Sequence, residues 1–160
     1  MINQGGKIAA KNGTELENLV KEIIENKDFQ FIEKNKFTLA ANGLKQKLYT
    51  QQLVIGESIY STKEYPCKLN ADFVLYDPKG KEKYLIIECK SQTSSGSVDE
   101  KYPYLNENIK NKYPHKTIVV LDAIGARPGA KLWLKNQQNQ NLMKVFENFS
   151  EFRAWAIKNL

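Results

Sequence analysis

The chain has 160 residues, of which 41% are hydrophobic, 26% charged and 11% aromatic, so it is long enough for one folded domain and is neither wholly disordered nor collagen-like. With 24 Lys and Arg against 18 Asp and Glu, its formal charge is +6, which favours a polyanionic partner (nucleic acid or an anionic membrane surface), the alternative being an ordinary basic surface. Two cysteines and one histidine exclude a disulfide framework, a four-cysteine zinc site and a His-Glu-x-x-His zinc site.

The sequence has no pattern of a signal peptide or a membrane span. Its N-terminus contains no apolar core, and its longest apolar runs are four or five residues. We therefore expect a cytoplasmic protein without a membrane partner.

A single domain is expected over residues 1–160, with residues 1–11 as a loose polar lead-in. Apolar residues then recur at helical spacing, which predicts a helix over Thr14–Asn26. Thr14 is a candidate N-cap, with Glu17 three residues on, as in a capping box. Residues 33–50 have no clear pattern.

The middle of the chain predicts an antiparallel hairpin. Residues 71–76 and 83–90 are rich in β-forming residues, and the segment Asp77–Lys81 between them has the composition of a turn. Two shorter strands are expected before this hairpin, at residues 29–32 and 52–55.

Helices and strands alternate in the second half of the chain. Trp133 and Trp155 are spaced with aliphatic residues and are expected in the core. The order of the elements indicates a mixed α/β domain. The expected elements are a polar loop at 91–97, a helix at 100–112, a buried strand at 116–121, a short helix at 130–136 and a last helix at 146–158.

Three charged residues of the hairpin carry the candidate chemistry. Glu88 and Lys90 share one face of their strand, and Asp72 faces Glu88 if the hairpin is centred on Gly80. Two such carboxylates suit a hard divalent cation, and the neighbouring ammonium can orient or deprotonate a water or stabilise developing charge. This pattern predicts metal-assisted hydrolysis of a phosphodiester. The alternative is a surface ion pair between Glu88 and Lys90, with Asp72 unrelated.

Asp72 followed by Glu88-Cys89-Lys90 resembles the PD-(D/E)XK nuclease superfamily, which includes type II restriction endonucleases, resolvases and repair nucleases. In that superfamily an Asp opens a hairpin and a Glu-x-Lys closes it; Ala71 stands where a Pro often precedes the Asp. The resemblance implies a restriction-endonuclease-like α/β core, with a central mixed β-sheet, an antiparallel hairpin and flanking helices. It also implies Mg²⁺, with Mn²⁺ as a substitute, held by Asp72, Glu88 and the backbone carbonyl of Cys89.

The resemblance extends to residues around the hairpin. A helical acid often assists in the superfamily, and Glu17 is the better match with Glu15 as the second candidate; a capping role for Glu17 is the alternative. The segment from Glu88 to Tyr104 is similar to a restriction-enzyme-like branch in which Gln92 would assist catalysis from the face of Glu88. The predicted DNA contacts are Ser94, Ser95, Ser97, Lys101, Arg127 and Lys131, a solvated loop being the alternative for those between residues 94 and 101.

The function expected from this resemblance is a Mg²⁺-dependent endodeoxyribonuclease acting on double-stranded DNA, as a type II restriction enzyme or its small catalytic subunit. Because cutting both strands needs two active sites, we expect a homodimer or a heterodimer with a recognition subunit. The alternatives are a structure-selective resolvase or repair nuclease and a non-catalytic DNA-binding module of the same fold. The sequence does not exclude RNA as the substrate.

Overall fold

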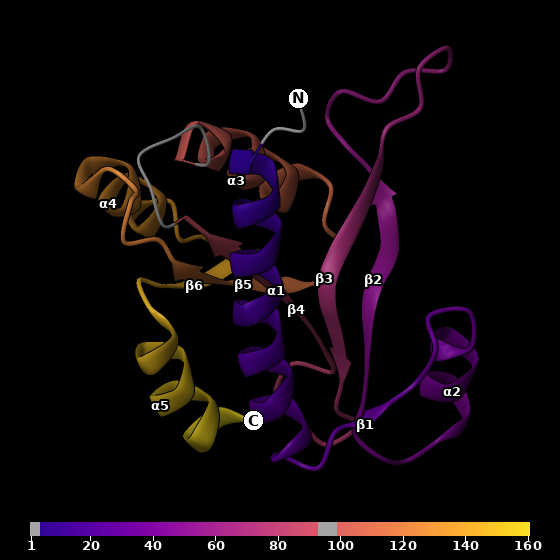
Figure 1. The fold of residues 1–160 in the computed structure, drawn as a ribbon. Coiled ribbons are helices and arrows are strands. Elements are labelled where there is room, and N and C mark those ends of the chain that lie inside the picture. The colour runs from indigo at the N-terminus through magenta and orange to yellow at the C-terminus, as the bar shows by residue number, and fades with distance from the viewer. Residues whose placement is uncertain (1–3, 93–98) are drawn as a thin grey trace.

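A mixed β-sheet forms the centre of the computed structural model, which describes residues 4–92 and 99–160 (Figure 1). Within these residues the strands lie in the order β1-β2-β3-β4-β5-β6. β2 pairs with β3, and β3 with β4, in antiparallel orientation. The pairs β1–β2, β4–β5 and β5–β6 are parallel. The strands are β1 (Gln30–Phe31), β2 (Leu48–Glu57), β3 (Lys68–Tyr76), β4 (Tyr84–Ser91), β5 (Lys116–Asp122) and β6 (Leu142–Phe146).

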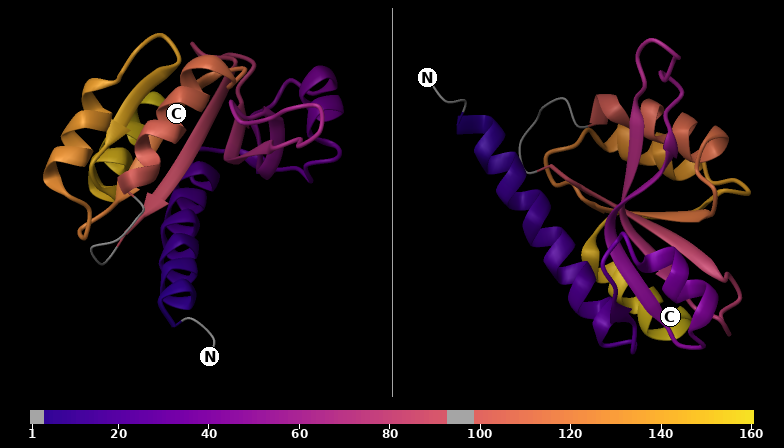
Figure 2. Two further views of the ribbon diagram at one scale, coloured as in Figure 1. Left: turned by 90° about the horizontal axis from the view of Figure 1, so that it is seen from above. Right: turned by 90° about the vertical axis from the view of Figure 1, so that its right-hand side faces the viewer.

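Helices cover both faces of the sheet, so the fold has three layers (Figures 1 and 2). On one face, α1 (Gln4–Glu25) and α5 (Phe149–Asn159) supply apolar side chains to one core cluster. On the other face, α2 (Phe37–Gly43), α3 (Tyr102–Asn111, preceded by the 3₁₀ turn η1, Asp99–Lys101) and α4 (Pro128–Asn136) supply a second cluster. The expected α/β class, with a central mixed sheet, an antiparallel hairpin and flanking helices, is confirmed.

The central strands are apolar on both faces because both faces are covered. In β4, Leu85 and Ile87 pack in the cluster under α1 and α5, whereas Ile86 packs in the cluster under α3. This is the alternation expected of an extended strand. A polar side chain in this strand therefore projects into one of two apolar layers.

The β2–β3 pair extends beyond the rest of the sheet. β3 and β4 are paired only as far as Phe73 and Ile87, whereas β2 and β3 stay paired out to Glu57 and Lys68. Figure 1 shows this ribbon leaving the sheet at the upper right. We call residues 53–71 the β2–β3 extension. Asp72 lies where the extension begins.

The N-terminal prediction is wrong in part. α1 begins at Gln4, so residues 4–11 are helical rather than a loose lead-in, and Thr14 lies inside the helix instead of capping it. Once the segment from Leu16 to Ile24 is packed on the sheet, extending the helix toward the N-terminus adds one hydrogen bond per residue without a new nucleation cost.

The sequence did not predict α2, β6 or the first residues of β2, and it placed one of the two tryptophans wrongly. α2 and the start of β2 lie in the segment without a clear pattern, and β6 lies between the two last predicted helices. Trp155 packs on Phe146 and Phe152 in the core as expected, but Trp133 is 39% exposed. Within the described residues, no helix is long and apolar enough to cross a bilayer.

Candidate active site

The hairpin between β3 and β4 has the predicted register. Val74 pairs with Ile86 and Leu75 with Leu85, so the pairs are symmetric about residue 80. The Asp77 carboxylate caps the turn by accepting a hydrogen bond from the Lys79 amide at 2.9 Å. Asp72 and Glu88 follow at the end of this ladder, where β3 and β4 separate.

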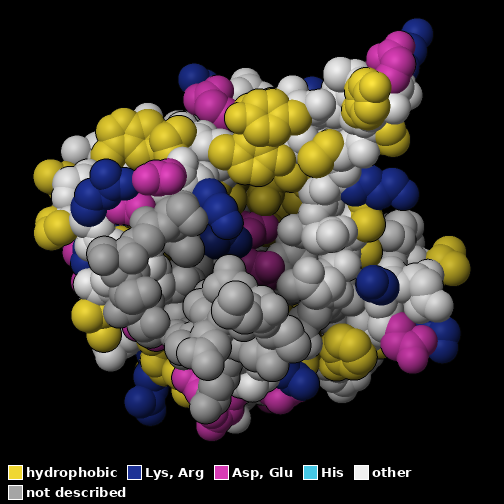
Figure 3. Space-filling model, turned by 45° about the horizontal axis from the view of Figure 1, so that its top comes forward, with side chains coloured by type: hydrophobic (Ala, Val, Ile, Leu, Met, Phe, Trp, Pro, Cys, Tyr) yellow, Lys and Arg dark blue, Asp and Glu magenta, His cyan; other side chains and the backbone are white. Residues whose placement is uncertain are grey.

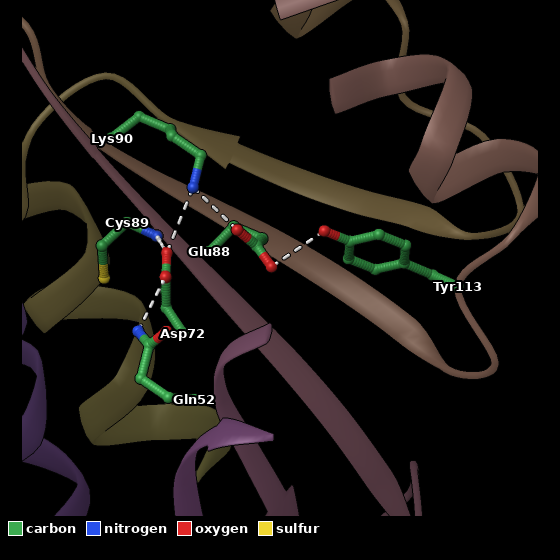
Figure 4. A network of polar contacts seen from close by, with 6 residues as sticks. All are labelled: Gln52, Asp72, Glu88, Cys89, Lys90 and Tyr113. Carbon is green, nitrogen blue, oxygen red and sulfur yellow. Dashed lines mark hydrogen bonds and ion pairs between the residues drawn. The ribbon is translucent and has the colours of Figure 1, made fainter. Parts of the chain in front are cut away.

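The three charged side chains of the hairpin meet at one point (Figure 4). Lys90 Nζ lies 3.1 Å from Asp72 Oδ2 and 2.7 Å from Glu88 Oε2. The Cys89 amide also donates to Asp72 Oδ2, at 2.8 Å. Because Glu88 is only 2% exposed, this cluster differs from the surface ion pair considered as the alternative.

Burial dominates the electrostatics of Glu88. It raises the pKa of this carboxyl from 4.5 to about 7, although Lys90 and a hydrogen bond from Tyr113 favour the charged form. For Lys90 burial acts in the opposite sense and lowers the pKa, but Glu88 and Asp72 outweigh it and hold the pKa well above its usual range. Lys90 is therefore an ammonium ion that bridges two carboxylates.

The residues of this cluster fit a divalent cation. The ammonium of Lys90 shows that one oxygen of Asp72 and one of Glu88 converge on a single positive charge. Carboxylate oxygens are the ligands that hard divalent cations prefer, and magnesium commonly takes one or two of them with waters and phosphate oxygens. The described residues contain no group of three or more His, Cys, Asp or Glu side chains that could hold a metal ion. Of the residues in this cluster, Asp72 and Glu88 have the carboxylates that would hold one. The thiol of Cys89 lies on the opposite, apolar face of β4, and ligation by its backbone carbonyl stays a prediction.

Glu17 lies within electrostatic reach of the cluster. Burial and the charge of Asp72 raise its pKa, and the charge of Lys90 lowers it. Glu17 is half-buried on the helix that packs against β4, whereas Glu15 is exposed. Because Thr14 is not an N-cap, the capping-box alternative for Glu17 is wrong.

Gln92 is buried where β4 meets the turn between β5 and α4. Its side-chain amide donates to the Gly125 carbonyl at 3.4 Å, and its backbone bonds to Asp122 and Gly125. These contacts tie two strand ends together at the carboxyl edge of the sheet. Assistance in catalysis by Gln92 stays a prediction.

The predicted DNA contacts have different surroundings. Lys101 is exposed and Lys131 half-buried at the surface. Arg127 is engaged by an acidic side chain: its Nε lies 2.7 Å and its Nη2 3.2 Å from the carboxylate of Asp99. Ser94, Ser95 and Ser97 lie outside the described residues.

Two polar residues that the sequence did not single out contact the carboxylates (Figure 4). Gln52 in β2 donates to Asp72 Oδ1 at 3.2 Å, and Tyr113, between α3 and β5, donates to Glu88 Oε1 at 2.9 Å. Neither contact follows from local spacing, because each joins the hairpin to a distant segment. Only the pairing of β2 with β3 could have pointed to Gln52.

The cluster is open to solvent on one side of the molecule. Figure 3 shows acidic side chains at the floor of a hollow, with basic and hydrophobic side chains above it. Asp72 and Lys90 each keep part of their side chain exposed, 15% and 28%. Solvent therefore reaches part of Asp72 and of Lys90.

Comparison with known proteins agrees with this geometry. Residues 8–160 match the PD-(D/E)XK nuclease superfamily domain, whose nucleases generally use divalent metal ions. No curated protein and no solved structure matches the chain significantly. Because the match covers nearly the whole chain and includes the β3–β4 hairpin with its charged cluster, the chain belongs to the PD-(D/E)XK nuclease superfamily.

Proposed function

We propose that the chain is a Mg²⁺-dependent endonuclease that hydrolyses phosphodiester bonds in double-stranded DNA, as a type II restriction enzyme or its small catalytic subunit. The observation that carries the proposal is the convergence of Asp72 Oδ2 and Glu88 Oε2 on Lys90 Nζ, at 3.1 and 2.7 Å. A buried carboxylate is costly unless it has a partner or a ligand. Carboxylates repel phosphates, so a module that only binds phosphates gains nothing from buried Glu88 and half-buried Asp72 at this position.

The roles of the three side chains follow from their chemistry. Asp72 and Glu88 would hold the Mg²⁺, which when bound would supply Lewis acidity to activate the phosphodiester and the attacking water. The water oxygen would bond to phosphorus and release its proton to solvent, while the P–O bond to the leaving sugar oxygen would break and that oxygen would take up a proton from solvent. Negative charge would accumulate on the phosphate oxygens in this step.

Lys90 is proposed to stabilise that charge. Because its two carboxylate neighbours raise its pKa, Lys90 carries a proton and a positive charge in this arrangement. It is therefore suited to donating a hydrogen bond to a phosphate oxygen rather than to taking a proton from water. Glu17 lies near enough to influence the charge of the cluster, and we propose that it assists.

Double-stranded DNA is the proposed substrate because the chain carries a formal charge of +6 and presents exposed lysines such as Lys101. A single cluster cuts one strand at a time. We therefore propose that two copies, or this chain with a recognition subunit, act together on a duplex.

Cleavage of supercoiled plasmid DNA tests the proposal. The wild-type protein with Mg²⁺ should produce linear DNA, and a chelator should stop the reaction. Asp72→Asn, Glu88→Gln and Lys90→Met should each slow cleavage by about 100-fold or more. Lys79→Met, in the exposed turn of the same hairpin, is the control and should cut at the wild-type rate.

The ends of the products decide between the kinds of nuclease. Cuts at one fixed sequence support a restriction enzyme, whereas cutting confined to branched DNA supports a resolvase or repair nuclease. Cleavage by Glu88→Gln at the wild-type rate would contradict the assignment of the site.

A further inference from the structure

Gln52 has an unusual backbone conformation beside the active site. Its φ is +52°, in the left-handed region that residues with a side chain rarely adopt within a strand. β2 and β3 pair on either side of it, at Gln51 with Phe73 and at Leu53 with Ala71, so Gln52 lies level with Asp72. Backbone strain of this kind persists where the surrounding structure enforces it, and it is concentrated at functional sites.

The alternation of side chains is interrupted at the same level. Ala71 packs in the core cluster under α3, whereas Phe73 packs in the cluster under α1 and α5. Residues two apart in a regular strand share a face, so β3 changes its facing at Asp72. In β2, Leu48 and Leu53 pack in the same cluster although they are five positions apart, an odd spacing that places a matching interruption in β2. Such irregularities re-aim side chains, and here they aim Gln52 and Asp72 at each other.

Gln52 donates to Oδ1 of Asp72, whereas the Cys89 amide and Lys90 donate to Oδ2. Its Nε2 lies 3.2 Å from Oδ1, while Oδ2 accepts from the Cys89 amide and from Lys90. Glu88 is held in the same manner, with Oε2 on Lys90 and Oε1 on the Tyr113 hydroxyl. In each carboxylate a neutral donor thus bonds to one oxygen, which is Oδ1 of Asp72 and Oε1 of Glu88. The other oxygens, Oδ2 of Asp72 and Oε2 of Glu88, both face the ammonium of Lys90 (Figure 4).

We propose that Gln52 is a positioning residue of the active site, which fixes the rotation of the Asp72 carboxylate and thereby the oxygen that it offers to a divalent cation. The proposal rests on the proposed function. The terminal torsion of an Asp side chain is broad, so without a donor on Oδ1 only the bonds to Oδ2 limit the rotation of the carboxylate. Partners that orient a ligand in this way commonly change metal affinity about 10–100-fold when they are removed.

Gln52→Gly removes the hydrogen bond to Asp72 and at the same time relieves the backbone strain, so it separates the effect of the side chain from the effect of the backbone conformation. Glycine adopts a positive φ without steric cost, so this variant should melt at or above the wild-type temperature. Its affinity for Mn²⁺, measured by titration calorimetry without DNA, should fall about tenfold. Gln51→Gly, one position away in the same strand, is the matched control and should keep the wild-type Mn²⁺ affinity.

A second readout does not depend on a metal ion. The Cys89 amide donates to Asp72 Oδ2, so its hydrogen exchange reports on the position of the carboxylate. In metal-free protein, Gln52→Gly should exchange this amide several-fold faster than both the wild type and Gln51→Gly. An unchanged exchange rate for the Cys89 amide would overturn the role of Gln52. A wild-type protein that neither binds Mn²⁺ nor cuts DNA would refute the proposed function instead, and the exchange measurement would still decide the role of Gln52.

Discussion

Replacing Glu88 by Gln should stabilise the metal-free protein at alkaline pH while abolishing its activity. The pKa of Glu88 is raised by burial, so the folded protein binds a proton at this position more tightly than the unfolded chain does. The contribution of Glu88 to stability therefore falls as the pH rises from 4.5 through 7. Glutamine keeps the shape of the side chain, can accept from Lys90 with its oxygen and can donate to Tyr113 with its amide, and does not titrate.

The size of the effect follows from the pKa. Raising the pKa of a carboxyl from 4.5 to about 7 corresponds to about 3 kcal/mol, since one pH unit is worth about 1.4 kcal/mol. In the presence of a chelator, Glu88→Gln should therefore exceed the wild type in unfolding free energy by about 3 kcal/mol at pH 8. Below pH 4.5 the two proteins should be nearly equal.

Urea denaturation at several pH values, with a chelator present, measures this difference. Titrating groups that do not interact with Glu88 contribute equally to both proteins and cancel in the comparison. Adding Mn²⁺ at pH 8 should stabilise the wild type by about 2.7 kcal/mol at 100 times its dissociation constant and should stabilise Glu88→Gln much less. A difference in stability that is independent of pH would refute the conclusion that ionised Glu88 is destabilised by burial.

Three further substitutions address other parts of the structure. Tyr113→Phe removes a hydrogen bond to the buried Glu88 carboxylate, so the unfolding free energy should fall by about 2 kcal/mol. Because this hydrogen bond lowers the pKa of Glu88, the pH midpoint of Mn²⁺ binding, measured by calorimetry across pH, should move upward. An unmoved midpoint would contradict the contact. Arg127→Ala leaves Asp99 without its bidentate partner, so it should lower the melting temperature at pH 7. Because Arg127 lowers the pKa of Asp99, this stabilisation is lost as the pH falls through that pKa, and the difference should vanish in strong acid, as thermal melts will show. If Lys131 contacts a phosphate, Lys131→Ala should weaken binding to all DNA sequences alike and reduce the slope of log affinity against log salt by about one; an unchanged slope would remove Lys131 from the interface.

The fold could be predicted from the sequence where local patterns are strong. The β3–β4 hairpin and β5 are compact runs of β-forming residues next to turn residues, and α1 has a regular apolar stripe. β6 was missed because it is a short strand at the edge of the sheet, paired only with β5 through a parallel connection. Parallel pairing joins distant segments and leaves no turn signal in the sequence.

The site could be predicted in its centre but not around it. Asp72, Glu88 and Lys90 belong to one hairpin, so the position of the turn fixes their proximity. Gln52 and Tyr113 come from other segments, and their contacts depend on how β2 and the end of α3 pack against that hairpin. The positive φ of Gln52 could not be predicted from its residue type, because glutamine has no preference for that conformation.

The β2–β3 extension is a part of the fold that can be considered separately from the charged cluster. All three charged side chains lie on one contiguous stretch of chain, while the ribbon from Leu53 to Ala71 projects past the end of the β3–β4 ladder. Exchanging the outer part of this ribbon for another hairpin, with Gln52 and Asp72 kept at its base, leaves the charged cluster on its original scaffold. The molecule thus offers engineers a graft point that is separate from the three charged side chains.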